Sequence, residues 1–586
     1  PIIGFDMGGT STDVSRFGGE FEMVFESETA GVRIQAPQLN IRTVAAGGGS
    51  RLFFENTMFM VGPESAGAHP GPVCYRKGGH LAVTDANLVL GRIQPRYFPH
   101  IFGPSQDMPL DLAGSQGAME EMAGQINAHN RRLGLPELSV EAAALGFVEV
   151  ANEVMARAIR EISVMRGFDI QTHVLATFGG AGPQHACAIA RALGIREIFI
   201  HHFAGILSAY GLGLADVVVD RQQPASGAYG PESMKAIENR LSGLREEAHS
   251  ALRDQGFAES GIVSTCYLNL RYEGTDTSLM VARPADNDFS REFRKAYLRE
   301  FGFELSDRQI LIDDIRVRAL GKSDSLRGHS IAKAEVPAEP MDTVDCWFKT
   351  GWLPAPVFDL GALKAGHCLR GPALVIHDSA TIVIEPDCQA AITEGGDVRI
   401  QLGIRPERAS DPEKDMAGGF KAATPVDPIR ISIFSNRFMS IAEQMGRMLQ
   451  KTAVSTNIKE RLDFSCALFG PGGELVANAP HVPVHLGAMS EAVKAQIRLR
   501  ANDLEPGDVL VSNHPAAGGS HLPDITVITP VFEKGEIIFW VAARGHHADI
   551  GGISPGSMPP GSRRLEEEGV CIASFKLVAK GRFQEA

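Results

Sequence analysis

The first part of the chain alternates short apolar runs with stretches in which apolar residues recur at helical spacing. From Glu141 to Met165, apolar residues stand at positions 145, 148, 151, 155, 158, 159 and 162. This spacing predicts a helix with one buried face. Two strand-like runs follow, HVLATF at residues 173–178 and REIFIHH at residues 196–202. Strands that alternate with helices predict an α/β fold for residues 1–215.

The rest of the chain changes its pattern several times. Residues 267–284 alternate apolar and polar side chains, as a half-buried pair of strands does. Residues 356–402 are rich in Val, Ile, Gly and Pro, which predicts a small β-rich domain. The next segment combines charge, Pro and Gly without periodicity, which is typical of a linker. We therefore predict four parts, at residues 1–215, 216–402, 403–425 (the linker) and 426–586.

Length and charge narrow the class of protein. With 586 residues, the chain exceeds what a single hydrophobic core supports. Its 70 acidic and 56 basic residues give a net charge of −14, which disfavours a nucleic-acid partner. The sequence has no apolar run near the roughly 18 residues of a membrane span. Eight scattered cysteines without a CxxC pair indicate neither a zinc ribbon nor a disulfide framework, so we expect a cytoplasmic location.

A glycine-rich turn follows the first apolar stretch, in the string DMGGTSTDV at residues 6–14. Glycines let backbone N–H groups converge on phosphate oxygens, and hydroxyl side chains add further donors. Asp6, at the strand end, is well placed to hold Mg²⁺ through water. Alone, such a turn is a weak signal, because many are plain turns. The predicted phosphate contacts are Gly8, Gly9, Thr10, Ser11, Thr12 and Asp13.

A second glycine turn, FGGAGPQHA from Phe178, lies between a predicted strand and a predicted helix. The first N–H groups of a helix are free to bind a ligand. We expect His185 to be a packed helix residue rather than a catalyst. A third glycine cluster precedes Arg51, which either approaches phosphate or, as we favour, follows a simple turn between strands. The residues predicted to contact nucleotide in the second turn are Gly179, Gly180, Ala181 and Gly182.

Two histidines and an aspartate near the C-terminal end have the chemistry of a metal site. Residues 525–532 and 537–544 read as a hairpin with Lys534-Gly535 at its turn. If Glu533 pairs with Glu536 across the turn, Asp524 pairs with Gly545 and lies beside His546. His521, three residues before Asp524, can then reach the Asp524 carboxylate. Two imidazoles and one carboxylate with open positions suit a divalent transition metal such as Mn, Fe or Zn.

Other polar residues of this region allow two interpretations each. His481 and His485 are four apart, but the intervening proline argues against one helix face. They either line a substrate cleft and transfer protons, or are hydrogen-bonded core residues. Asp463 either faces the same cleft or, as we slightly favour, pairs with a neighbouring basic residue. We expect Cys466 to be a buried thiol, and His547 to point away from His546.

These motifs together resemble one protein family. DMGGTSTDV resembles the second phosphate loop of the actin, Hsp70 and sugar-kinase ATPase fold, and FGGAGPQHA its adenosine loop. In this wording, both are similar to the hydantoinase A/oxoprolinase family. Residues 457–489, 518–532 and 544–560 resemble hydantoinase B. Fused A and B units look most like ATP-hydrolysing 5-oxoprolinases.

The resemblance implies one lobe of an actin/Hsp70-like ATPase fold, then a small β-rich domain, then the start of an α+β hydantoinase B-like domain. It implies ATP-dependent hydrolysis of 5-oxo-L-proline, or a related cyclic amide, with ATP and Mg²⁺. The alternatives are a hydantoinase, an N-methylhydantoinase or a ketone carboxylase of the same family, or a nucleotide-binding fragment without turnover. The residues implied in catalysis are Asp6, His481 and His485. The family's metal ligands map onto His521, Asp524 and His546.

The family's first phosphate loop, a DTGGTFTD-like string, has no counterpart in this sequence. We therefore expect an internal fragment of a longer parent enzyme, and we expect that parent to be a homo-oligomer. Phosphoryl transfer depends on positioning from both sides of a cleft. The fragment alone should then bind ATP with millimolar or weaker affinity and show no turnover.

Overall fold

The computed structural model places two compact units, which are formed by residues 1–215 with 323–434 and by residues 216–322 with 435–586. Most of the predicted linker, residues 404–425, lies outside the described residues. Among the helices that are described, none has both the length and the apolar character needed to cross a membrane. The described residues are all of 1–586 except 20, 25–26, 30–31, 35–37, 276–277, 302, 324–328, 404–426, 454, 460, 479–481, 502, 557 and 586.

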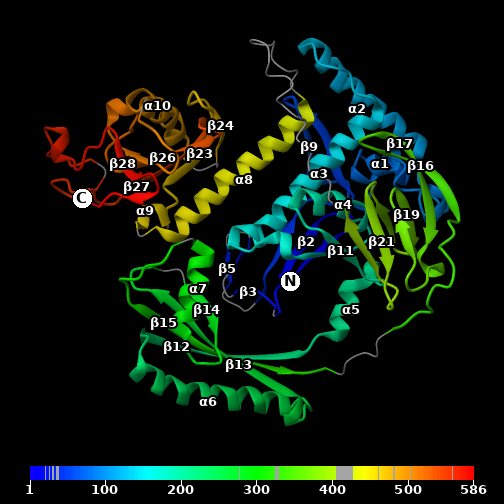
Figure 1. Ribbon diagram of the computed structural model, residues 1–586, viewed down its shortest axis with the longest axis horizontal. Helices are drawn as coiled ribbons and strands as arrows, with labels where there is room; N and C mark the ends of the chain where they lie inside the picture. Colours follow the sequence, from blue (N-terminus) through cyan, green and yellow to red (C-terminus); the bar gives the residue numbers. More distant parts are fainter. Residues whose placement is uncertain are drawn as a thin grey trace. The chain divides into compact units, whose positions relative to one another are not determined.

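An eight-stranded mixed sheet forms the centre of the first unit (Figure 1). The first strand of the chain, β1 (Ile2–Met7), pairs in parallel with β10 (Val174–Phe178), which precedes the second glycine turn. On its other side, β1 pairs antiparallel with β2 (Thr12–Phe17), which follows the first glycine turn. Both glycine turns therefore lie at the same end of neighbouring strands. The strands, in spatial order, are β18 (Cys368–Arg370), β21 (Cys388–Ile392), β22 (Val398–Leu402), β11 (Glu197–Ile200), β10, β1, β2 and β7 (Ile41–Val44).

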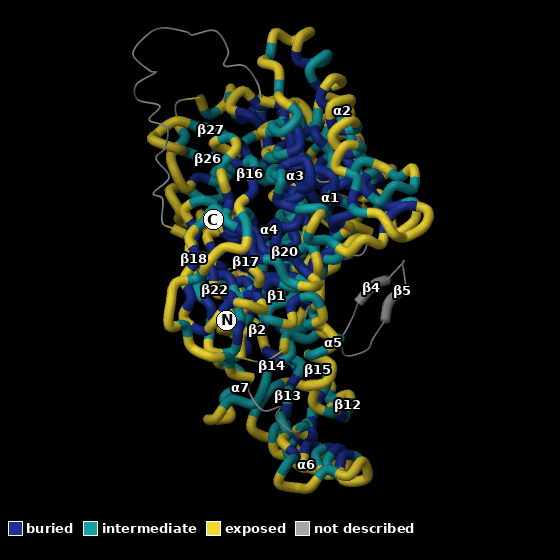
Figure 2. Tube along the Cα trace, turned by 90° about the vertical axis from the view of Figure 1, so that its right-hand side faces the viewer, coloured by how far each residue is buried: buried dark blue, intermediate teal, exposed yellow. Residues whose placement is uncertain are grey.

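Helices cover this sheet, and the predicted helix at 141–165 is confirmed as α3 (Val140–Ile162). Ser139 caps it, because its side chain accepts a hydrogen bond from the Ala142 N–H. Phe147 on its apolar face is fully buried, and Figure 2 shows this helix as one of the most buried parts of the chain. The remaining helices of this unit are α1 (Val83–Val89), α2 (Leu112–Leu133), α4 (Gly182–Leu193) and α5 (Leu207–Leu214).

The region 356–402 forms strands, as expected, but it does not form a single separate domain. Its last strands, β21 and β22, complete the eight-stranded sheet, because β22 pairs antiparallel with β11. This pairing covers an edge that β11 would otherwise leave open. β18 also belongs to that sheet, whereas β17 (Gly351–Asp359), β19 (Ala373–His377) and β20 (Ala380–Ile384) form a four-stranded sheet with the preceding strand β16 (Asp342–Phe348). Smaller pairs join β8 (Ser50–Glu55) to β9 (Met58–Ser65), β3 (Met23–Val24) to β6 (Gln38–Leu39), and β4 (Ser27–Thr29) to β5 (Val32–Ile34).

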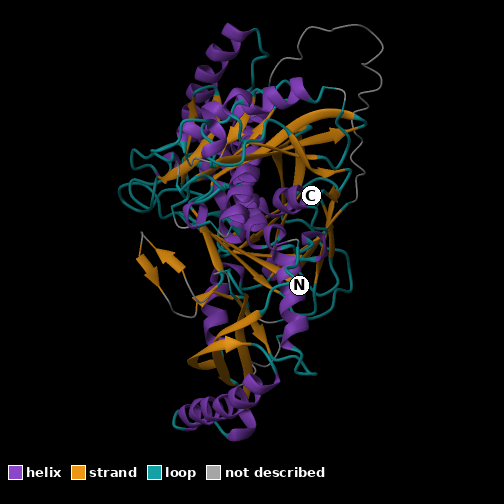
Figure 3. Ribbon diagram, turned by 90° about the vertical axis from the view of Figure 1, so that its left-hand side faces the viewer, coloured by secondary structure: helices purple, strands orange, loops and turns teal. Residues whose placement is uncertain are grey.

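The second unit contains two antiparallel sheets. The predicted strand pair at 267–284 is confirmed as part of β13 and β14, and α6 (Pro231–Arg253) lies against the strands of this four-stranded sheet (Figure 3). Its apolar side chains Leu241 and Leu244 are buried there. The sheet is formed by β12 (Val217–Ala228), β15 (Ile310–Gly321), β13 (Ile262–Tyr272) and β14 (Leu279–Ala282), with α7 (Phe289–Phe301) beside it.

A seven-stranded sheet carries the predicted metal ligands. Met489 and Val493 of α10 (Pro483–Leu499) pack on Trp540 of this sheet in one buried cluster. The strands, in spatial order, are β24 (Leu475–Asn478), β23 (Phe464–Phe469), β27 (Glu536–His546), β26 (Asp524–Glu533), β25 (Val509–Ser512), β28 (Phe575–Ala579) and β29 (Arg582–Phe583). The helices that precede the sheet are α8 (Pro428–Thr452) and α9 (Thr456–Lys459).

Candidate nucleotide-binding and metal-binding sites

The first glycine turn joins β1 to β2 and sets two carboxylates side by side. Asp6 pairs across the strands with Asp13, and both are half-buried on the same face. Burial raises the pKa of Asp6; a hydrogen bond from the Ser208 Oγ at 3.0 Å lowers it, and the charge of Asp13 raises it further. Like charges directly opposite each other destabilise a strand pair unless a cation lies between them. The pair therefore has the charge and oxygen donors that suit Mg²⁺.

The other residues of this turn divide into exposed and buried ones. Gly9 and Thr10 are exposed at its tip, and the Gly8 N–H donates to the Ser11 carbonyl at 3.1 Å. Thr12 is fully buried, and its hydroxyl donates to the Ala46 carbonyl at 2.6 Å. The prediction that the Thr12 side chain contacts phosphate is therefore wrong, because strand alternation turns that side chain into the core.

The second glycine turn packs directly on the first. Gly179 has φ +78°, and a Cβ built there would lie 2.5 Å from the Asp6 Oδ1 and would overlap the Met7 carbonyl. The Ala181 N–H donates to that carbonyl at 3.1 Å. Only glycine fits this approach. Gly182 then begins α4, and the N-cap residue before it, Ala181, offers no capping side chain. The free N–H groups at this helix end therefore suit an anionic ligand.

The third glycine cluster lies beside the first turn as well. The N–H groups of Gly48 and Gly49 donate to the carbonyls of Gly8 and Gly9 at 3.1 and 2.6 Å. Arg51, by contrast, pairs with Glu64 at 2.7 Å within the β8–β9 hairpin. The favoured interpretation of this segment, a turn between strands, is thus confirmed. Through its two hydrogen bonds, the segment also holds the first glycine turn in place.

His185 is a packed residue, as expected. It is buried in α4, and its Nδ1 lies 2.7 Å from the Asn152 Oδ1. Burial, together with the nearby charge of Arg92, lowers the pKa of His185 to about 3, so the ring is neutral at ordinary pH. Cys466 is likewise a buried thiol, whose pKa burial raises to about 12.

In the second unit, the three predicted metal ligands lie together. Asp524 Oδ2 is 3.0 Å from His521 Nδ1, and Asp524 Oδ1 is 2.9 Å from His546 Nδ1. One donor atom from each residue lies within 4.8 Å of the others. Ligands of a single ion at about 2 Å each stand no more than about 4–4.5 Å apart, so small side-chain adjustments suffice for binding.

The hairpin that carries this cluster differs from its predicted register. The turn is as predicted, because Lys534 and Gly535 both have positive φ, at 50° and 86°. A β-bulge then shifts the pairing between Val531 and Phe532, so Asp524 pairs with His546 and not with Gly545. Residues directly opposite each other share a face of the sheet. The bulge is therefore what puts the His546 ring on the same side as the Asp524 carboxylate.

Asp524 is the electrostatic centre of the group. Burial alone would raise its pKa, but hydrogen bonds from His485, His521, Ser520 and His546 hold the pKa well below its usual range. The bond to Asp524 in turn raises the pKa of His521. A carboxylate that stays ionised while buried among imidazoles is a strong donor for a divalent cation. The residues present therefore fit a transition-metal ion.

His485 joins this cluster, which the sequence left undecided. It is buried in the first turn of α10, where Pro483 begins the helix, and its Nε2 lies 3.4 Å from Asp524 Oδ2. The same atom is 3.7 Å from Asp463 Oδ1, so the less favoured interpretation of Asp463, that it faces the cleft, fits its position better. His481 lies outside the described residues.

Two neighbours of the cluster, Ser520 and Arg544, had no role in the sequence interpretation. Ser520 donates to Asp524, and Arg544, fully buried, donates to the Thr526 Oγ1 and the Gly518 carbonyl, both at 2.8 Å. Burial lowers the pKa of Arg544 to about 10. Arg544 was detectable in principle, because it stands two residues before His546 and so on the same strand face.

The residues that follow His546 lie outside the group of His521, Asp524 and His546. His547 is not part of the group of three, and its N–H donates to the Pro523 carbonyl at 2.9 Å. Asp549 accepts a hydrogen bond from the Gly551 N–H at 2.9 Å, so it caps the turn.

Comparison with known proteins now decides the family. Family models described as Hydantoinase/oxoprolinase, Hydantoinase/oxoprolinase C-terminal domain and Hydantoinase B/oxoprolinase match residues 1–221, 326–395 and 427–586. The chain belongs to the hydantoinase/oxoprolinase family. It is 54% identical to 5-oxoprolinase 1 of Arabidopsis thaliana and 52% identical to 5-oxoprolinase of Dictyostelium discoideum. Each match covers 100% of this chain and 46% of the relative, so the chain spans about half the length of these relatives.

Solved structures agree with this assignment. The crystal structure of the ATP-dependent caprolactamase from Pseudomonas jessenii is similar with a TM-score of 0.61 and 27% identity, over 69% of this chain and 59% of that one. A nucleotide-free acetone carboxylase is similar in fold, with a TM-score of 0.51 and 22% identity, over 68% and 58%. The predicted fold class, a mixed α/β chain related to the ATPases of this family, is confirmed.

Proposed function

We propose that the parent enzyme hydrolyses 5-oxo-L-proline to L-glutamate and couples this reaction to the conversion of ATP to ADP and phosphate. The relatives named 5-oxoprolinase, which match over the whole of this chain, support the substrate. The observation that carries the chemistry is the buried Asp524 among imidazoles, because hydrolysis of an unreactive amide needs a site that activates water.

Nucleotide is assigned to the first unit. Asp6 and Asp13 would hold Mg²⁺, and the turn from Gly9 to Ser11 would donate N–H and hydroxyl groups to phosphate. The turn from Gly179 to Gly182 and the N-terminus of α4 contact the rest of the nucleotide. Transfer of the terminal phosphoryl group to the amide oxygen makes the ring carbon a better electrophile. The reaction then uses two waters: one adds to the ring carbon as the C–N bond breaks, and one releases phosphate.

Ring opening is assigned to the second unit. His521, Asp524 and His546 would hold a divalent transition metal, Mn, Fe or Zn, which supplies Lewis acidity and lowers the pKa of a water. The ring nitrogen needs a proton as the C–N bond breaks. His485, which touches both Asp524 and Asp463, is the proposed proton donor, with His481 as a second candidate.

The cysteines bear on where the parent enzyme is located. All eight cysteines are free thiols, which supports a reducing compartment, and we propose the cytoplasm. We propose a homo-oligomeric parent with a small cyclic amide as its substrate.

The proposed function is tested with a panel of substrates. The parent enzyme is incubated with ATP and 5-oxoproline, hydantoin, N-methylhydantoin, caprolactam, or acetone with bicarbonate, and ADP and products are measured. We expect glutamate from 5-oxoproline and the highest kcat/KM for that substrate. Turnover of caprolactam, a hydantoin or acetone without glutamate formation would assign a sister activity of the family, and nucleotide binding without ADP release would indicate a nucleotide-binding protein without turnover.

A further inference from the structure

A second group of two histidines and one aspartate lies in the first unit, outside the sites above. His201 and His202 follow the last residue of β11, and Asp397 directly precedes β22. The antiparallel pairing of Ile200 with Val398 brings these strand ends together. One donor atom from each residue lies within 4.8 Å of the others, the same compactness as the Asp524 group.

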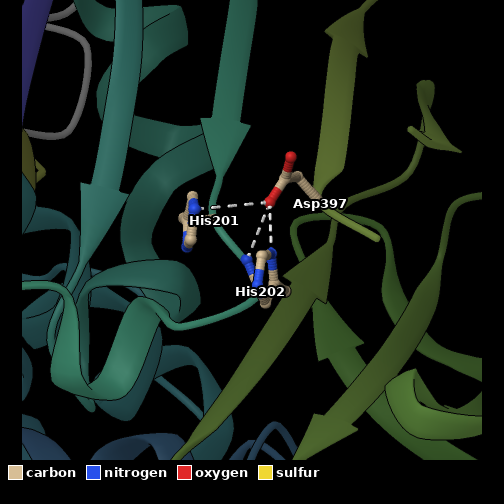
Figure 4. A group of neighbouring side chains, drawn as sticks. All are labelled: His201, His202 and Asp397. Carbon is tan, nitrogen blue, oxygen red and sulfur yellow. Dashed lines mark hydrogen bonds and ion pairs between the residues drawn. The ribbon is translucent and has the colours of Figure 1, made fainter. Parts of the chain in front are cut away.

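The two histidine rings face the same side. Adjacent residues of a strand point to opposite faces, but β11 has ended at Ile200, and the rings of His201 and His202 stack with centroids 4.2 Å apart. Figure 4 shows both rings beside the Asp397 carboxylate. His202 Nδ1 lies 2.8 Å and His201 Nε2 lies 3.9 Å from the same oxygen, Asp397 Oδ1.

The carboxylate is held in place from several directions. Asp397 Oδ1 accepts a hydrogen bond from the His202 N–H at 3.0 Å, and Oδ2 accepts one from the Thr393 Oγ1 at 3.1 Å. Burial would raise the pKa of Asp397, but the bonds from His202 outweigh it and lower the pKa. The three side chains keep 15–18% of their surface exposed.

One ring nitrogen of this group lacks a hydrogen-bond partner among the described residues. His202 donates from Nδ1 to Asp397, which leaves a lone pair on Nε2, and this buried atom has no hydrogen-bond partner among the described residues. Buried polar atoms of this kind call for an explanation. The ring of a third histidine, His329, lies nearby, with its centroid 5.4 Å from that of His202.

We propose that His201, His202 and Asp397 bind one divalent transition-metal ion, distinct from the ion proposed at Asp524. Two imidazoles and one carboxylate with open positions are a ligand set for Zn²⁺ and its neighbours. Binding displaces ring protons, so it strengthens as pH rises. His201 Nδ1 accepts a hydrogen bond from the Phe203 N–H at 3.0 Å; a ring bound through Nε2 carries its proton on Nδ1, so this contact opens on binding.

The position of the site gives such an ion a structural consequence. The Ala204 N–H donates to the His201 carbonyl at 2.8 Å, and the Gly179 N–H donates to the Ala204 carbonyl at 2.9 Å. A bound ion would therefore hold residues 201–204 in place, and these residues contact the second glycine turn through the Gly179 N–H.

Co²⁺ titration of the metal-free protein tests the proposal, with visible absorption and calorimetry as readouts. We expect two equivalents for the unaltered protein. His202→Ala and Asp397→Asn should each lose one equivalent and keep the one removed by His546→Ala. His100→Ala, which changes an exposed histidine elsewhere in the same unit, should keep both.

Two results would overturn the proposal: two equivalents retained by His202→Ala and Asp397→Asn, or a single equivalent in the unaltered protein that His546→Ala removes. If His202→Ala does not fold, as judged by circular dichroism, His201→Gln provides the same test. Loss of the equivalent at His546 alone concerns the proposed hydrolytic site, so the two hypotheses fail separately.

Discussion

The glycine turns of the first unit and the Asp524 group of the second unit are built in opposite ways. In the first unit, backbone groups approach one another closely, and the tip at Gly9 and Thr10 is exposed. In the second, a buried carboxylate is surrounded by side-chain donors. The first site depends on the absence of side chains and the second on their charges. The two should therefore respond to different kinds of substitution.

The largest effect is expected for Asp524→Asn. This change removes the negative charge that His485, His521 and His546 face, and loss of one member of a buried ion pair costs about 3–5 kcal/mol of unfolding free energy. Urea unfolding and metal analysis measure both consequences, and one metal equivalent should be lost. Asp549→Asn, which alters only a turn cap, should change stability by less than about 1 kcal/mol. Unchanged metal content in Asp524→Asn would contradict the assignment.

Gly179→Ala tests the opposite principle. The added Cβ meets Asp6 and Met7, and φ of +78° strains any L-residue. We expect a loss of at least about 2 kcal/mol in unfolding free energy, with weaker nucleotide binding. Gly9→Ala is the matched control, because a Cβ there meets nothing within 4 Å. Equal stability of the two variants would show that the close approach of the glycine turns is not required.

Asp6→Ala should weaken Mg²⁺–ATP binding without unfolding the first unit. Removal of the proposed Mg²⁺ carboxylate should abolish ATP hydrolysis in the parent enzyme and weaken Mg²⁺–ATP binding more than about tenfold, or about 1.4 kcal/mol. The fold should persist, since the side chain is only half-buried. Glu55→Ala, an exposed carboxylate of the same unit, serves as the charge control. Normal turnover in Asp6→Ala would remove this residue from its proposed role.

The smallest effect concerns pH. The pKa of His185 is lowered to about 3 in the folded protein, so the unfolded chain binds a proton first as pH falls below about 6.5, and stability decreases from there down to about pH 3. Between about pH 7.5 and about pH 6 this residue should cost about 0.8 kcal/mol. His185→Gln should lack this component in unfolding titrations at both pH values; an identical pH dependence would contradict it.

The sequence predicted the elements that depend on local rules. The helix α3 follows from apolar spacing, and the turn at Lys534-Gly535 follows from the φ values that glycine allows. It did not predict that β22 joins β11, because such pairing between distant strands is decided by which edges remain open and not by local pattern.

The same distinction applies to the sites. His521, Asp524 and His546 lie near one hairpin, so their meeting could be expected from the sequence. His485 and Asp463 joined them through packing of α10 and β23, which no spacing reveals. His201 and Asp397 are almost two hundred positions apart in the chain. Thr12 begins β2, and strand alternation turns its side chain into the core, which the glycine-rich motif alone did not reveal.

The bulge in the β26–β27 hairpin has an evolutionary consequence. Strand side chains alternate with a period of two, so a single-residue insertion or deletion between Val531 and Phe539 would move His546 to the opposite face from Asp524. A change of two residues would preserve their common face. Among descendants of this chain, hairpins that keep the Asp524 group should therefore vary in length in steps of two, while loops elsewhere on the same sheet gain and lose single residues freely.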